Sequence, residues 1–158
     1  MYVHNHGLLA NDAMKTWQFG ALWWIFFINI TCGIGLLSLA SPMAQETIGM
    51  TPAAAASLVG IIGIFNGGGR IAWSTISDYF GRAQTYILFF VIQIIAFYVL
   101  AETNNALTFQ VLILLIITCY GGGFACMPAY LADLYGIRQL STIPVSYTHM
   151  TLPTILRV

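Results

Sequence analysis

The sequence predicts an all-α fold, a polytopic transmembrane helical bundle with four spans. Ten of its 158 residues are charged, five Lys and Arg and five Asp and Glu, and 59% are hydrophobic. Soluble domains usually have about 25% charged and about 45–50% apolar residues. A bilayer core about 30 Å thick needs roughly 20 consecutive apolar residues for each helix. Four uncharged windows are long enough, at 16–45, 47–69, 83–101 and 103–132.

Proline and threonine mark the ends of the first two helices. We expect the first helix at about 17–39, because Pro42 has no backbone donor and disfavours helix in the residue before it. Thr51 can cap a second helix at about 52–76, with Pro52 in the favoured first turn.

Glycine and asparagine separate the other two helices. Gly81 and Arg82 are predicted to form a tight turn into a third helix at about 84–100. The polar residues 103–105 break the chain before a fourth helix at about 107–131. Connections this short make consecutive helices antiparallel neighbours.

Positive charges predict the orientation in the membrane. Lys15, Arg82 and Arg138 fall on one side of the four helices, whereas the two opposite loops carry one glutamate each and no Lys or Arg. Because cytoplasmic loops are enriched in Lys and Arg, both termini are expected to be cytoplasmic. Residues 1–16 then form a cytoplasmic linker ahead of the membrane region at 17–143.

The composition excludes several classes of function. Cys32, Cys119 and Cys126 lie in apolar windows, where they behave as small hydrophobic residues. His4 and His6 have no third ligand nearby, so we expect no metal and no cofactor. A net charge of zero gives no reason to expect a nucleic-acid partner. An enzyme is not expected either, since no His, Cys or paired acids converge in the spans.

Small and polar residues are expected to join the helices. Gly60, Gly63 and Gly67 recur at spacings of three and four, which places them on one face of the second helix as a close-packing seam. Asn29 and Gln93 lie at span centres and need hydrogen-bond partners there. We interpret that pair as links between neighbouring helices.

The fourth helix carries a glycine triplet and a proline. Gly121, Gly122 and Gly123 each cost about 1 kcal/mol in a helix, and Pro128 follows them. The pattern is typical of an interrupted helix that lines a transporter cavity. Close packing alone explains the triplet equally well, and both interpretations stay open.

Arg70 is the main candidate for a binding residue. An arginine at membrane depth costs roughly 2.5–3.5 kcal/mol and therefore indicates function. The eight residues from Arg70 to Asp78 span about 12 Å of helix, towards mid-membrane. An internal ion pair or a snorkelled side chain is the alternative, but no acidic residue lies within the four windows. Tyr120 and Phe124 are one turn apart and can wall an organic-anion pocket, although such aromatic pairs more often contact lipid or core.

Residues 74–82, STISDYFGR, resemble the loop signature of the major facilitator superfamily. Asp78, Gly81 and Arg82 stand in register with that signature, which lies between the second and third helices of each half. The departures from it are Ser74, Tyr79 and Ala83. Degeneracy of this kind is usual in the second half of these transporters, so the resemblance implies helices seven to ten of twelve.

Two glycine-rich segments are similar to the oxalate/formate antiporter branch of this superfamily. They are GIFNGGGRIAWSTISDYFGR at 63–82 and YGGGFACMPAYLADLYG at 120–136, supported by SPMAQE at 41–46. The resemblance covers residues 12–143 and implies that Arg70 matches the helix-eight arginine that binds the substrate carboxylate. It also implies that Asp78, Gly81 and Arg82 form a conformational latch.

The resemblance implies a secondary active transporter that moves small carboxylates by alternating access in the bacterial inner membrane. Its partners are a small organic anion, the lipid bilayer, and the missing N-terminal six-helix half and last two helices of the same transporter. The family's second cationic residue, a lysine on helix eleven, has no counterpart here. We expect the fragment alone to be inactive. The alternative is a self-contained four-helix membrane protein that acts as a dimeric exporter or an interaction subunit.

The last residues of the chain differ from the rest. Residues 144–158, PVSYTHMTLPTILRV, are polar and β-branched and show no helical periodicity. The string VSYTHMTLPT resembles, but for one residue, the translation of a transposon-end sequencing adapter. We therefore expect 144–158 to be a disordered artefact of the gene model.

Overall fold

The computed structural model describes residues 14–136. They form four long helices, α2 (Trp17–Glu46), α3 (Pro52–Phe80), α4 (Arg82–Glu102) and α5 (Ala106–Tyr135). All four are long and apolar enough to cross a membrane. The predicted bundle of four spans is confirmed, and the chain is an integral membrane protein. The predictions for His4, His6, Arg138 and residues 144–158 lie outside the described residues.

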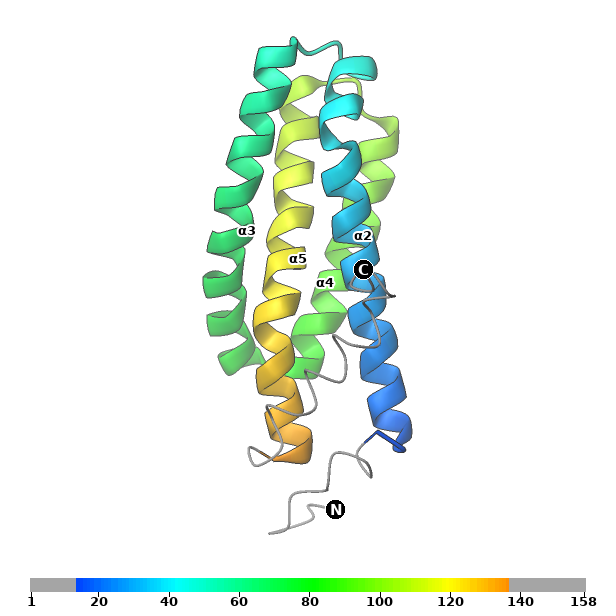
Figure 1. Ribbon diagram of the computed structural model, residues 1–158, viewed down its shortest axis with the longest axis vertical. Helices are drawn as coiled ribbons and strands as arrows, with labels where there is room; N and C mark the ends of the chain where they lie inside the picture. Colours follow the sequence, from blue (N-terminus) through cyan, green and yellow to red (C-terminus); the bar gives the residue numbers. More distant parts are fainter. Residues whose placement is uncertain (1–13, 137–158) are drawn as a thin grey trace, which may run out of the picture.

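Consecutive helices run antiparallel, and α5 lies at the centre of the bundle (Figure 1). α5 contacts α2, α3 and α4, and its largest contact is with α3. The start of α2, the α3–α4 turn and the end of α5 lie together at one end of the bundle (Figure 1). Lys15 and Arg82 therefore share an end, as the pattern of positive charges predicts.

Side-chain caps explain where three of the helices begin. Thr51 Oγ1 accepts a hydrogen bond from the Ala54 N–H at 3.3 Å, with Pro52 as the first residue of α3. The prediction of a Thr51 cap is confirmed. Thr16 caps α2 in the same way, and the Asn105 side chain accepts from two backbone N–H groups at the start of α5. These side chains satisfy donors that the first turn of a helix leaves free.

The end of α2 differs from the prediction. The helix does not stop near Pro42 but continues through it to Glu46. Proline removes one donor, which a membrane helix tolerates when its neighbours support it. Ala40 and Ala44 flank the proline and are completely buried in the core, so packing holds this last turn of α2 in place.

Of the two interpretations of the glycine triplet, the structure supports close packing and not an interrupted helix. α5 runs unbroken through the glycine triplet and Pro128 to Tyr135. A Cβ at Gly121, Gly122 or Gly123 would lie closer than 3.0 Å to Asn66, Trp73 and Asn29, respectively. The triplet is therefore a place where side chains and backbone from α2 and α3 meet the α5 backbone, and close packing accounts for it.

The predicted seam of glycines on α3 is not a contact within residues 14–136. A Cβ at Gly60, Gly63 or Gly67 would meet no atom within 4 Å. α3 instead packs on α5 through Gly69, where a Cβ would lie 2.7 Å from the Thr118 Cα. Helical periodicity explains this, because Gly69 shares a face with the buried residues of α3 and the three other glycines do not.

The predicted polar link between helices is confirmed. Gln93 Nε2 of α4 donates to Asn29 Oδ1 of α2 at 2.9 Å, and both side chains are buried. Asn29 Nδ2 and Gln93 Oε1 have no hydrogen-bond partner among the described residues. The pair therefore joins α2 to α4 beside Gly123 of α5.

Candidate functional site

Arg70 lies on α3, and its exposed side chain contacts two groups. Its Nε donates to Asn66 Oδ1, one turn earlier, at 3.3 Å. Its guanidinium carbon lies 5.7 Å from the centre of the Phe124 ring on α5, at cation–π distance. Within residues 14–136 no carboxylate pairs with Arg70. The side chain is therefore held by an amide and a ring, and its positive charge is not neutralised there.

Aromatic side chains support the Phe124 ring. Tyr120 meets it edge to face with ring centres 5.3 Å apart, and Phe26 of α2 does the same at 5.1 Å. Tyr120 is only 8% exposed, and its ring lies against Gly33 of α2, where a Cβ would clash with it. The buried Tyr120 therefore supports the Phe124 ring from inside the bundle, while the Phe124 ring contacts Arg70.

The structure thus brings together the three residues that the sequence proposed for binding, Arg70, Tyr120 and Phe124. Sequence reasoning missed Asn66, Phe26 and Gly33. Asn66 had a usable signal, because a polar residue four positions before an arginine lies on the same helical face. Phe26 and Gly33 had none, since both look like ordinary residues of an apolar span.

The Arg70 site is open at the surface of the bundle. An apolar groove of about 460 Å³, lined by Ile64, Gly68, Ala72 and Thr118 among others, does not include Arg70. By helical periodicity, this groove lies on the side of the α3–α5 contact opposite to Arg70. The side of α3 that carries Arg70 also carries Gly63 and Gly67, and no side chain of residues 14–136 covers these two glycines.

A second cluster lies at the end of the bundle that holds the α3–α4 turn. The Arg82 guanidinium contacts Asp78 through Nη2 at 2.6 Å and Asp133 through Nε at 3.2 Å. Its Nη1 also donates to Ser77 Oγ at 3.0 Å. Arg82 therefore connects the ends of α3, α4 and α5. Asp133 was missed because nothing local marks an acidic residue as the partner of a distant arginine.

Gly81 forms the whole connection between α3 and α4. Its backbone has φ 94° and ψ 146°, a conformation that residues with a Cβ rarely adopt. It ends α3 and precedes α4, which places Asp78 and Arg82 within reach of each other. The predicted tight turn is confirmed, with Arg82 as the first residue of α4.

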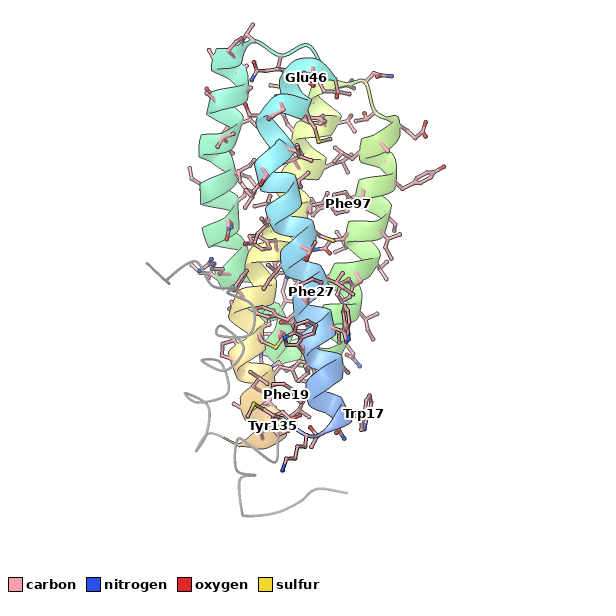
Figure 2. All side chains as sticks on the ribbon, turned by 45° about the vertical axis from the view of Figure 1, so that its right-hand side comes forward. Trp17, Phe19, Phe27, Glu46, Phe97 and Tyr135 are labelled. Atoms are coloured by element: carbon pink, nitrogen blue, oxygen red, sulfur yellow. The ribbon has the colours of Figure 1, made fainter. Side chains whose placement is uncertain are left out.

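Aromatic residues lie at the same end (Figure 2). Figure 2 shows Trp17, Phe19 and Tyr135 together, with Glu46 at the opposite end of the bundle. The Tyr135 hydroxyl and Thr16 Oγ1 share a hydrogen bond at 2.8 Å, which joins the start of α2 to the end of α5. Trp and Tyr are typical of the region where a membrane protein meets the lipid headgroups.

Each of the two sites in the described part is built around an arginine. Among residues 14–136, no group of three or more His, Cys, Asp or Glu side chains is placed to hold a metal ion. Arg70 lies within the length of α3, whereas Arg82 is the first residue of α4, so the two arginines mark two separate sites. One presents a positive charge inside a span, and the other links three helix ends.

A bundle of four apolar helices, with an arginine inside one span that pairs with no carboxylate among residues 14–136, is the architecture of an integral membrane protein. Comparison with known proteins agrees. The chain is 28% identical over 130 residues, 80% of its length, to the oxalate:formate antiporter of Oxalobacter formigenes. It is 24% identical over 131 residues, 82% of its length, to the uncharacterized MFS-type transporter YhjX of Escherichia coli strain K12.

The chain spans about a third of the length of these curated relatives, 31% and 33%. It matches no protein-family model and no solved structure. The predicted resemblance is confirmed, because the first relative is an oxalate:formate antiporter and the second is a transporter of the major facilitator superfamily. The chain is therefore similar to one part of a transporter of this superfamily.

Proposed function

We propose that this chain is part of the C-terminal half of a secondary transporter for small carboxylates, covering helices seven to ten. The observation that carries the proposal is the Arg70 guanidinium, which is held by Asn66 and Phe124 and has no carboxylate partner among residues 14–136. A charge at membrane depth is costly and is usually paired. A substrate anion is the partner that this site lacks.

The chemistry of arginine suits a carboxylate. The planar guanidinium can donate two parallel hydrogen bonds to the two oxygens of one carboxylate, and it stays charged at any physiological pH. The supporting ring of Phe124 is apolar and covers one side of the guanidinium, and the hydrocarbon core of the bilayer around a span has a low dielectric constant. Attraction between the two ions is stronger there than in water.

The uncovered side of α3 beside Arg70 supports the proposal that the binding site is incomplete in this chain. Arg70 lies beside Gly63 and Gly67, where the described chain provides no covering atoms. Small residues allow another helix to approach closely. We propose that the N-terminal six-helix half of the transporter covers this flank and that the last two helices complete the C-terminal half. The fragment alone is then inactive.

The Arg82 cluster fits the role of a conformational latch. Its contacts to Asp78 and Asp133 join three helix ends at what we propose is the cytoplasmic side of the inner membrane, where Lys15 also lies. Alternating access requires that such contacts form in one state and break in another. Gly81 provides the turn that lets Asp78 and Arg82 meet.

The test of the proposed function is carboxylate exchange by the full-length protein in proteoliposomes. We expect Arg70→Gln to abolish exchange and Arg70→Lys to impair it, because a point charge loses the two parallel hydrogen bonds. Asn104→Gln, in the exposed loop between α4 and α5, is the control for expression and insertion. Normal exchange by Arg70→Gln would refute the proposal.

Sequencing of the gene and its flanks separates this proposal from a self-contained four-helix protein. Reading frames for six earlier and two later helices would support the transporter. A ribosome-binding site before Met1 and a stop codon soon after position 143 would support the small protein. The same reads test residues 144–158, since an uninterrupted genomic frame through them would show that they are native.

A further inference from the structure

We propose that Asn66 is a positioning residue that restricts Arg70 to one binding edge, and that this restriction makes the site selective for carboxylates over spherical anions. The inference rests on the proposed function, because it concerns the same site. It assigns a role to a side chain that contacts no ligand itself. Three observations carry it.

The first observation is the hydrogen bond from Arg70 Nε to Asn66 Oδ1 at 3.3 Å. The two residues lie one turn apart on the same face of α3, so the bond needs no contact from another helix. The second is the Phe124 ring, 5.7 Å from the guanidinium carbon. An acceptor at Nε and a ring beside the plane together limit rotation of the guanidinium.

The third observation is that Asn66 is itself fixed against α5. A Cβ on Gly121 would lie 2.8 Å from Asn66 Oδ1 and closer still to the Asn66 carbonyl oxygen. Asn66 therefore occupies space that is free only because Gly121 has no side chain. This packing gives the first glycine of the α5 triplet a role in the Arg70 site, in addition to joining α3 to α5.

The consequence follows from the donors of arginine. A guanidinium can meet a carboxylate along the edge with Nε and one Nη, or along the end with both Nη atoms. Because Asn66 occupies Nε, the end with Nη1 and Nη2 remains for the anion. Either edge offers two parallel donors, so the selectivity comes from the fixed orientation of the guanidinium: a carboxylate needs both donors aligned with its two oxygens, whereas a halide has only one centre and gains little from alignment.

The exchange measurements use the 158-residue chain in lipid nanodiscs, and the anion titrations use the full-length transporter, in which the proposed site is complete; both carry ¹⁵N-labelled arginine. The chain has four arginines, Arg70, Arg82, Arg138 and Arg157, so Arg→Lys variants assign each Nε–H signal. We compare Asn66→Leu, which removes the acceptor, with Asn66→Asp, which keeps an acceptor but neutralises the site. Asn104→Leu is the matched control in an exposed loop.

Without ligand, we expect the Arg70 Nε proton to exchange with water roughly 2- to 10-fold faster in Asn66→Leu, as loss of an ordinary hydrogen bond implies. Asn66→Asp should keep the slow exchange of the unchanged protein. In titrations at constant ionic strength, Asn66→Leu should weaken binding of formate by a similar factor and leave binding of chloride unchanged. Asn66→Asp should lose both anions, because its carboxylate occupies the guanidinium.

Equal exchange rates in Asn66→Leu and Asn104→Leu would overturn the proposal, as would a parallel loss of formate and chloride. Far-UV circular dichroism checks that each variant stays helical, and Asn66→Asp keeps the test decisive if Asn66→Leu does not fold. A different result would refute the proposed function without refuting the role of Asn66. If the full-length transporter shows no formate-dependent shift of the Arg70 signal, the carboxylate site is refuted, while the exchange rates of the 158-residue chain still decide whether Asn66 positions Arg70.

Discussion

Replacement of Gly123 by alanine should destabilise the bundle, although the same change elsewhere on a helix is favourable. The new Cβ would clash with the Asn29 side chain, which is buried and hydrogen-bonded to Gln93. Forcing an extra methyl group into a packed core costs about 1–3 kcal/mol. Breaking the Asn29–Gln93 hydrogen bond adds about 0.6–1.7 kcal/mol in a membrane protein.

The helix propensity of alanine offsets about 1 kcal/mol of this cost. The net effect of Gly123→Ala should therefore be a loss of about 0.6–3.7 kcal/mol in the free energy of unfolding. Gly60→Ala is the matched control, because a Cβ there meets no atom within 4 Å. That variant should be neutral or more stable by up to about 1 kcal/mol.

The assay is reversible unfolding of the purified chain in mixed micelles with increasing SDS, followed by far-UV circular dichroism. A double-mutant cycle identifies the cause of the loss. The nearest atoms to the new Cβ all belong to Asn29, so Gly123→Ala should cost at least about 1 kcal/mol less in an Asn29→Ala background. An equal cost in both backgrounds, or a Gly123→Ala protein as stable as Gly60→Ala, would refute the reasoning.

Two further predictions concern the latch. Asp133→Asn should change the free energy of unfolding by no more than about 1 kcal/mol, because exposed ion pairs contribute little. The same substitution should shift the full-length transporter towards opening at the Arg82 end, which is measured as faster cysteine labelling of that end. Unchanged labelling would argue against a latch. Gly81→Ala should cost about 1–3 kcal/mol in the SDS assay, because φ 94° strains any residue with a Cβ, and a neutral Gly81→Ala would contradict this backbone assignment. Ala83→Gly is its control.

The number and order of the helices could be predicted from the sequence because length and local chemistry determine them. Thr51 and Gly81 act within one turn of their own positions, so their roles as cap and turn can be read locally. The end of α2 could not be predicted in this way. Pro42 favours a stop locally, and the packing of Ala40 and Ala44 against other helices overrides it.

The faces of the helices were harder to predict. In a soluble bundle, polar residues mark the outer surface, but in a membrane the outer surface is apolar too. The periodicity of the α3 glycines therefore indicated a packing face without showing which glycine packs. Gly69 does so, whereas Gly60 and Gly63 remain open in the described chain.

Inside the spans, a polar side chain was the reliable signal. Arg70 stood out because an arginine inside a span is costly, and Asn29 and Gln93 stood out for the same reason. Asp133 and Phe26 did not, since each acts through a partner on a distant helix. Contacts of that kind depend on how the helices pack, which a single sequence without homologues does not reveal.

Both arginine sites bridge α3 and α5, the second of them through Arg82 of α4. Arg70 of α3 stacks on Phe124 of α5, and Arg82 joins the end of α3 to Asp133 of α5. Between them, Gly121 and Gly122 bring the two backbones close together against Asn66 and Trp73. A contact so tight cannot slide by small steps, because packed interfaces have discrete arrangements. If the latch opens during transport, α3 and α5 should therefore move as one body, and the anion site should travel with them intact.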